Sequence, residues 1–191
     1  RFAGEDAPSA LAARGFNDRV IYTGTYSKPF ATGIRVGFGV LPEPLFTRVL
    51  RIKGNHDFGT ANLLQQVLAW AIASGRYEVH LAKLRVRYAA KARVMQQALI
   101  EHSPGWVRWQ EPEGGLYYWA RLPKRLKSGM KSRLFKAALA KGVLYVPGEL
   151  CYADDPTRPK PNYEMRISFG GASLPDLREG IARLGRVLQG L

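Results

Sequence analysis

Two hydroxyl residues, a lysine and an arginine lie close together near the start of the sequence. Thr25, Ser27 and Lys28 are almost adjacent, and Arg35 follows seven positions after the lysine. Hydroxyls and a guanidinium suit a phosphate group, because they donate hydrogen bonds and the guanidinium is permanently charged. A neutral lysine amine attacks aldehydes. The group therefore indicates a lysine beside a phosphate, and the alternative is an exposed lysine with solvated neighbours.

The neighbouring segments predict a loop at the end of a buried strand. Arg19–Thr23 is rich in β-branched and aromatic residues and predicts a strand. Gly24–Gly33 predicts a loop, because Pro29 and Gly33 interrupt regular helix. Ile34–Leu41 alternates and predicts a second strand. Loop residues held at the end of a sheet are a common place for a ligand site.

Helices are predicted after this loop. Pro42–Ile52 predicts a short helix, and Gly54–Thr60 predicts a turn-rich break that contains His56 and Asp57. Asn62–Ala73 is nearly all apolar or small, so we expect a helix buried on most sides. A long amphipathic helix begins near Tyr77 and stops at Pro104-Gly105. Ser74-Gly75 is the best candidate domain boundary.

The second half of the sequence alternates short strands with helices, which indicates a small α+β layer. The predicted strands are Trp106–Gln110, Gly115–Leu122, Val143–Val146 and Tyr163–Phe169. The predicted helices are Met130–Lys141 and Asp176–Leu188.

Arg166 lies in the last of these strands and is a second candidate ligand residue. Alternation directs Met165, Ile167 and Phe169 to the apolar layer and Arg166 to the opposite face, together with Glu164. A guanidinium in that position can hold a carboxylate through two hydrogen bonds. The alternative is a surface arginine paired with Glu164 or a similar acid.

Composition narrows the classes of protein. The 191 residues are 46% hydrophobic, which suits a globular fold, and no apolar run is long enough to cross a membrane. The single cysteine, Cys151, lacks partners at metal-ligand spacing, so we predict no metal site. The net charge of +14 leaves a nucleic-acid module open as an alternative, although solvated helix faces explain the basic clusters.

The motifs together resemble a known family. Gly24–Phe38 (GTYSKPFATGIRVGF) is similar to the cofactor-lysine segment of fold-type I, pyridoxal phosphate (PLP)-dependent aminotransferases of class I and II. Glu113–Trp119, Gly142–Gly148 and Met165–Gly170 resemble later segments of that family in the same order. The resemblance is greatest to the branch containing 2-aminoadipate-type transaminases and MocR-type regulators.

This resemblance implies roles for the candidate residues. Lys28 would form a Schiff base with PLP, Thr25, Ser27 and Arg35 would bind the cofactor phosphate, and Arg166 would bind the substrate α-carboxylate. The fold implied is α/β and α+β. Residues 1–75 would be the end of the PLP-binding large-domain sheet, and residues 76–191 the connecting helix and the small carboxy-terminal α+β domain.

The resemblance places this sequence in the carboxy-terminal half of such a protein. Other cofactor contacts of the family precede the lysine segment, and Asp6 is not in a matching context. We therefore expect a cytoplasmic transaminase portion, inactive alone, that acts on an amino acid and a 2-oxo acid and forms a homodimer at full length. The alternatives are the ligand-sensing domain of a MocR-type regulator, with DNA bound by a separate domain, and a fold-type I decarboxylase or condensing enzyme.

Overall fold

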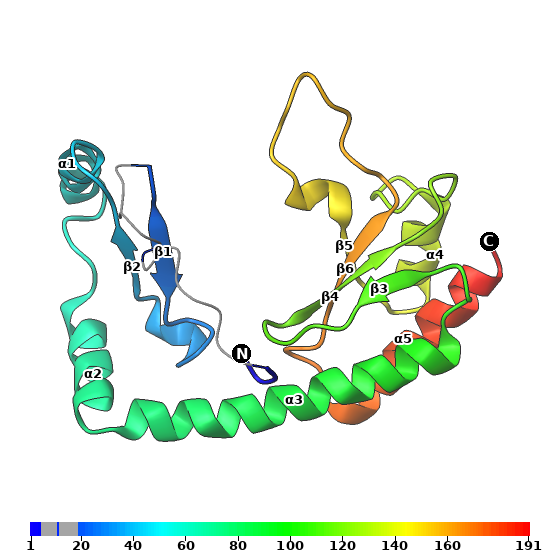
Figure 1. The fold of residues 1–191 in the computed structure, drawn as a ribbon, viewed down its shortest axis with the longest axis horizontal. Helices are drawn as coiled ribbons and strands as arrows, with labels where there is room; N and C mark the ends of the chain where they lie inside the picture. The colour runs from blue at the N-terminus through cyan, green and yellow to red at the C-terminus, as the bar shows by residue number, and fades with distance from the viewer. Residues whose placement is uncertain (5–10, 12–18) are drawn as a thin grey trace. The chain divides into compact units, whose positions relative to one another are not determined.

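The computed structural model describes residues 1–4, 11 and 19–191, so Asp6 lies outside the described residues. The chain divides into two compact units (Figure 1). One unit, here called the lysine unit, ends at Arg85 and contains Lys28. The other, the arginine unit, combines Arg1–Gly4 with Val86–Leu191. The division falls inside a helix, and the domain boundary at Gly75 stays a prediction for the whole protein.

The lysine unit contains an antiparallel strand pair, β1 (Tyr22–Thr25) and β2 (Gly37–Val40), in which Thr25 pairs with Gly37. The two predicted strands therefore exist, but both are shorter and begin later than predicted. The 3-10 turn η2 (Thr32–Ile34) occupies the start of the second predicted strand, because the backbone reverses there before β2 begins. The buried core of this unit contains Ile34, together with Val36 and Leu68.

Two helices follow in the lysine unit. Helix α1 (Leu45–Asp57) runs through Gly54, so the predicted break there is wrong and His56 and Asp57 end a helix. A single glycine costs a helix only about 1 kcal/mol relative to alanine, which the rest of α1 tolerates. Helix α2 (Asn62–Ala73) has the predicted bounds. The prediction that α2 is buried on most sides is wrong, since among its residues only Leu68 and Ala71 are buried.

Helix α3 (Arg76–His102) is the predicted long amphipathic helix. Its buried residues all lie in its second half, within the arginine unit: Ala92, Met95, Ala98 and Leu99. These positions recur at helical spacing and form one apolar stripe. The main chain of α3 also takes part in the packing, because the buried Tyr118 hydroxyl donates a hydrogen bond of 3.0 Å to the Ala92 carbonyl.

The arginine unit is built on a four-stranded antiparallel sheet of order β3-β4-β6-β5. The strands are β3 (Arg108–Gln110), β4 (Tyr117–Arg121), β5 (Val146–Pro147) and β6 (Glu164–Ser168). Strand β5 starts at Val146, so the strand predicted over 143–146 is displaced toward Pro147. Tyr145 is buried just before it and donates to the Ser128 carbonyl, which fixes the chain before β5 begins.

Two capped helices complete the arginine unit. The Ser132 hydroxyl caps α4 (Arg133–Ala140), and the Ser173 hydroxyl caps α5 (Leu174–Gln189). Each serine oxygen accepts a backbone N–H of the first helical turn, which would otherwise lack a partner. The core joins α3, α4 and α5 to one face of the sheet (Figure 1). This two-layer arrangement agrees with the predicted α+β layer.

The first residues of the chain pack on the arginine unit. The Phe2 ring lies edge-on to Phe169 at a centroid distance of 6.0 Å. The Arg1 guanidinium donates to a Glu113 carboxylate oxygen at 2.8 Å, and the backbone N–H of Phe2 donates to the Glu113 carbonyl. In the part of the chain that the structure describes, no helix is long and apolar enough to span a bilayer.

Candidate functional site

The predicted phosphate ligands are joined by hydrogen bonds within one loop of the lysine unit. The Ser27 backbone N–H donates to Thr25 Oγ1 at 3.1 Å, and Arg35 Nη1 donates to Ser27 Oγ at 3.4 Å. Ser27 is buried, whereas Thr25, Lys28 and Arg35 are exposed. Arg35 has a left-handed backbone with a φ of 49° and follows η2 directly. The structure therefore brings Thr25, Ser27 and Arg35 together beside Lys28.

Backbone hydrogen bonds and aromatic contacts fix this loop. The Tyr26 N–H donates to the Val36 carbonyl at 2.9 Å, which continues the β1–β2 ladder for one more pair. The Phe30 N–H then donates to the Tyr26 carbonyl at 3.0 Å and closes a turn around Lys28. The rings of Tyr26 and Phe30 both lie near the Tyr77 ring, at centroid distances of 5.9 and 6.1 Å. Lys28 is therefore held on an ordered turn.

The hydrogen bonding of the loop fits a phosphate ligand. The Thr25 and Ser27 oxygens both act as acceptors inside the loop, so each hydroxyl proton is left to donate outward. Arg35 donates to Ser27 through Nη1, and the other N–H groups of its exposed guanidinium can donate to an anion. Two hydroxyl donors and one guanidinium form a donor set that suits a phosphate dianion.

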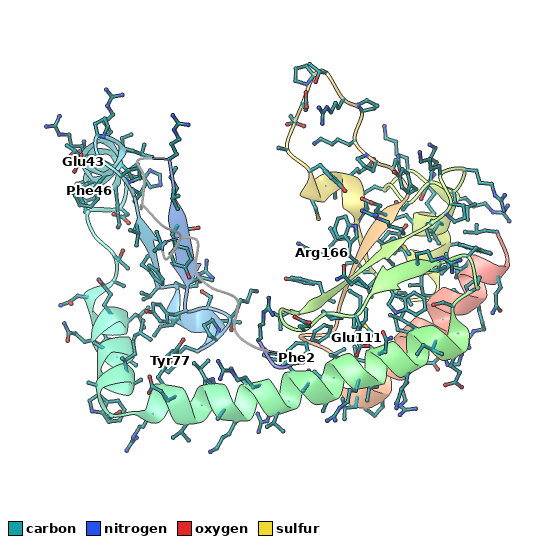
Figure 2. The ribbon with its side chains drawn as sticks, viewed as in Figure 1. Phe2, Glu43, Phe46, Tyr77, Glu111 and Arg166 are labelled. Carbon is teal, nitrogen blue, oxygen red and sulfur yellow. The ribbon has the colours of Figure 1, made fainter. Side chains whose placement is uncertain are left out.

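Arg166 lies on the face of the sheet opposite α3, α4 and α5, here called the open face, and alternation had predicted this orientation (Figure 2). Its guanidinium carbon is 4.4 Å from the centroid of the Tyr117 ring. Its Nε is buried and has no hydrogen-bond partner among the described residues. A buried donor without a partner costs on the order of 1–3 kcal/mol, and more when it is charged. A carboxylate bound to Arg166 would remove that cost.

The alternative pairing of Arg166 with Glu164 is wrong, because Glu164 has other partners. One Glu164 oxygen accepts from Arg121 Nε at 2.8 Å, and the other accepts from the Tyr152 hydroxyl at 2.6 Å. The hydrogen bond to Glu164 raises the pKa of Tyr152 and keeps its hydroxyl a donor. The sequence did not indicate this network. Alternation gave the face of Glu164, but both partners are distant in the chain.

Two surface depressions flank Trp119 on the arginine unit. One, of about 290 Å³, is lined partly by Arg108 and Arg121. The other, of about 570 Å³, is lined partly by Tyr117 and by Glu111, which Figure 2 labels. A third depression of about 870 Å³ lies between α4 and α5, whose residues take no part in the Arg166 site. Within the described ranges, no group of three His, Cys, Asp or Glu residues could hold a metal ion.

Comparison with known proteins defines the class to which this fold and these residues belong. The profile of the family "Aminotransferase class I and II" matches residues 2–184. The chain belongs to this family.

The sequence is similar both to a protein named as an enzyme and to a protein named as a regulator. The chain is 37% identical to aromatic-amino-acid aminotransferase 1 of Thermococcus litoralis over 99% of its own length and 43% of that protein. It is 29% identical to the probable rhizopine catabolism regulatory protein MocR of Rhizobium meliloti over 96% of its length and 36% of that protein. The chain therefore spans less than half the length of these relatives.

A solved structure shows the same fold. The chain superposes with a TM-score of 0.85 on an α-aminoadipate aminotransferase from Thermus thermophilus, in complex with N-(5'-phosphopyridoxyl)-L-leucine. The two are 32% identical, and the match covers 99% of this chain and 47% of that one. The predicted PLP-transferase fold is confirmed, and the family and this ligand indicate pyridoxal phosphate as the cofactor.

Proposed function

We propose that this chain is the carboxy-terminal portion of a PLP-dependent aminotransferase that exchanges the amino group of an amino acid with a 2-oxo acid. In this proposal, Lys28 forms the Schiff base with the cofactor, Thr25, Ser27 and Arg35 bind its phosphate, and Arg166 binds the substrate α-carboxylate. The observation that carries the proposal is the hydrogen-bonded group of Thr25, Ser27 and Arg35 beside Lys28.

The cofactor, when bound, supplies an aldehyde for the amine and a ring that accepts electrons from the substrate Cα. The chain supplies placement and proton transfer. The turn between Tyr26 and Phe30 presents the Lys28 amine next to the phosphate ligands. When it is not bonded to the cofactor, the Lys28 amine would act as the base that takes the substrate Cα proton and as the acid that returns it.

Arg166 has a positioning role in this proposal. Two parallel hydrogen bonds from a guanidinium to a carboxylate fix the orientation of an amino acid as well as its location. The Tyr117 ring lies against the guanidinium and limits its rotamers before a ligand arrives. The buried Nε, which has no hydrogen-bond partner in the described part of the chain, supports a role for Arg166 in binding an acceptor group of a ligand.

A second candidate function is ligand sensing in a MocR-type regulator, since such a regulator is among the similar proteins. The same Lys28 and Arg166 chemistry would then bind a ligand, and a separate domain would bind DNA. The two candidates differ in turnover by the whole protein. A cytoplasmic location and a homodimer of the whole protein are further parts of the proposal.

The test is chemical trapping on Lys28. We expect PLP followed by borohydride reduction to add one phosphopyridoxyl group to Lys28 of the chain, as measured by peptide mass spectrometry. Lys28→Ala should lose this product completely, because the nucleophile is gone. Lys83→Ala is the matched control, since it also removes an exposed lysine from the lysine unit. Equal labelling of wild type and Lys28→Ala would contradict the proposal.

We also propose that the chain alone does not turn over. The test is to incubate it with PLP, an amino acid and a 2-oxo acid, and to measure the new amino acid formed. We expect labelling at Lys28 without sustained product. Sustained transamination would show that the chain is catalytically sufficient and would contradict this part of the proposal.

A further inference from the structure

The open face of the sheet in the arginine unit carries a second arginine close to Arg166. In the β4–β6 register, Trp119 lies opposite Arg166, and Arg121 lies opposite Glu164. Arg121 is therefore the diagonal cross-strand neighbour of Arg166. Such neighbours lie about 7–8 Å apart, within reach of long side chains. A ligand with two carboxylates could contact both arginines if both were available.

Arg121 is engaged by a buried carboxylate. The Glu164 side chain is only 2% exposed, and Arg121 Nε donates to it at 2.8 Å. Tyr152 donates to the second oxygen of Glu164 at 2.6 Å, so both oxygens have partners. Because Glu164 is removed from water, its charge is compensated mainly by Arg121. The Arg121 side chain is 63% exposed and uses only its Nε for Glu164, but the pair as a whole is neutral, so the carboxylate weakens the attraction of Arg121 for a second anion.

The surroundings of Arg166 are aromatic. Tyr117 lies against its guanidinium, and Trp119 is its cross-strand partner. The Tyr152 ring meets the Trp119 ring edge-on at a centroid distance of 6.2 Å, and its hydroxyl is turned to Glu164. Glu164 therefore fixes Tyr152 as well as Arg121. The surface next to Arg166 is suited to an apolar or aromatic group.

Arg108 is another arginine on this face, because it lies opposite Arg121 across β3 and β4. It lies two strands away from Arg166, which is about 9–10 Å in the hydrogen-bonding direction. Its guanidinium also donates to the Gly105 carbonyl. Arg121 is therefore the arginine whose pairing decides how a second carboxylate is received.

We infer that Glu164 is a specificity-determining residue that withholds Arg121 from the ligand at Arg166. The ligand class that follows has one carboxylate and an uncharged, apolar or aromatic remainder, in preference to a dicarboxylate. The inference rests on the proposed role of Arg166 as the carboxylate ligand. It adds that the buried Glu164, supported by Tyr152, sets the charge that the rest of the ligand can carry.

The test compares two probes, 3-phenylpropionate and glutarate, in NMR titrations of the full chain. We expect wild type to bind 3-phenylpropionate more tightly. Glu164→Gln should improve the affinity for glutarate relative to 3-phenylpropionate by about tenfold, because a freed guanidinium gains a charge-assisted hydrogen bond. The double variant Arg121→Gln/Glu164→Gln removes both charges and should return the ratio to within about threefold of wild type, since one such bond is lost again.

An unchanged ratio in a folded Glu164→Gln variant would overturn the inference. If that variant fails to fold, the double variant decides, because it leaves no unpaired buried charge. A loss of glutarate affinity beyond threefold in the double variant would show that Arg121 already serves the ligand and would also overturn the inference. Arg166→Gln separates the two claims. It should remove binding of both probes, and retained binding would contradict the proposed role of Arg166 instead.

Discussion

The two units bury very different amounts of apolar surface. In the arginine unit, the described core cluster contains eighteen buried residues, which come from three helices and the sheet. In the lysine unit, the described cluster contains three, Ile34, Val36 and Leu68. Helix α1 contributes no buried residue, and its Leu50 and Ile52 are 54% and 68% exposed.

This difference shows that the candidate residues in the two units are supported by different amounts of core packing. Arg166 extends from a strand whose other face is part of a complete core and which is hydrogen-bonded to β4 and β5, so packing and the sheet together fix its backbone. The lysine loop is fixed by hydrogen bonds and a few rings around Tyr26. Side chains on rigid elements are held more precisely than those on loops. We therefore expect the arginine unit to be the more stable of the two.

The largest expected effect, and the strongest test of this difference between the units, comes from truncating one phenylalanine in each unit. Phe169→Ala removes a fully buried ring and should lower the free energy of unfolding of the arginine unit by about 3–5 kcal/mol. Phe46→Ala removes a ring that is 44% exposed on α1 and should lower the free energy of unfolding of the lysine unit by about 0.5 kcal/mol or less. Urea denaturation measures both. Equal losses would mean that α1 belongs to a core as complete as that of the sheet.

A smaller effect is expected on ligand binding at the lysine unit. Ser27→Ala removes one proposed phosphate donor and the acceptor of Arg35, so the binding free energy of PLP should weaken by about 1.5–3 kcal/mol, the value of a hydrogen bond to a charged group. Fluorescence titration measures the change. Ser74→Ala is the matched control in the same unit, because its hydroxyl donates to the Ala71 carbonyl at the end of α2. Comparable losses in the two variants would argue against the phosphate site.

The smallest expected effect is a dependence of the arginine unit on alkaline pH. Burial raises the pKa of the Tyr118 and Tyr145 hydroxyls well above the ordinary value of 10.0. The unfolded chain therefore ionises first. The stability from each tyrosine is complete below about pH 10 and falls by about 1.4 kcal/mol for each pH unit above it.

Denaturation series at increasing pH test this expectation. Tyr145→Phe should reduce the slope of the unfolding free energy above pH 10, and Tyr22→Phe, which alters a ring 38% exposed, should keep the wild-type slope. A slope that does not respond to Tyr145→Phe would show that other groups control the alkaline transition.

Local patterns predicted much of the fold. The apolar run between Thr60 and Ser74 gave the bounds of α2, and strand alternation gave the outward direction of Arg166. The errors came from competing local signals. Gly54 indicated a break, but the rest of α1 continues the helix through it. The exposure of α2 was not predictable, because burial depends on which elements surround a helix and composition does not specify them.

The lysine-loop part of the candidate site was predictable because its residues are close in the sequence. Thr25, Ser27 and Arg35 lie in one loop, and their spacing together with the family resemblance was enough to select them. The pairing of Glu164 was not predictable, because Arg121 is 43 positions away and reaches it only through the β4–β6 register. Tyr152 follows a turn whose path the sequence does not specify.

The docking of Phe2 and Arg1 on the arginine unit has a topological consequence. The chain leaves this unit after Gly4 and returns to it at Val86, so the lysine unit is an insertion anchored at both ends. A segment whose two ends are held together has fewer unfolded conformations than a segment with one free end. The entropy cost of bringing its ends together is met when the arginine unit folds. The edge-to-face contact of Phe2 with Phe169 therefore helps to hold the first end of the inserted unit, which contains Lys28.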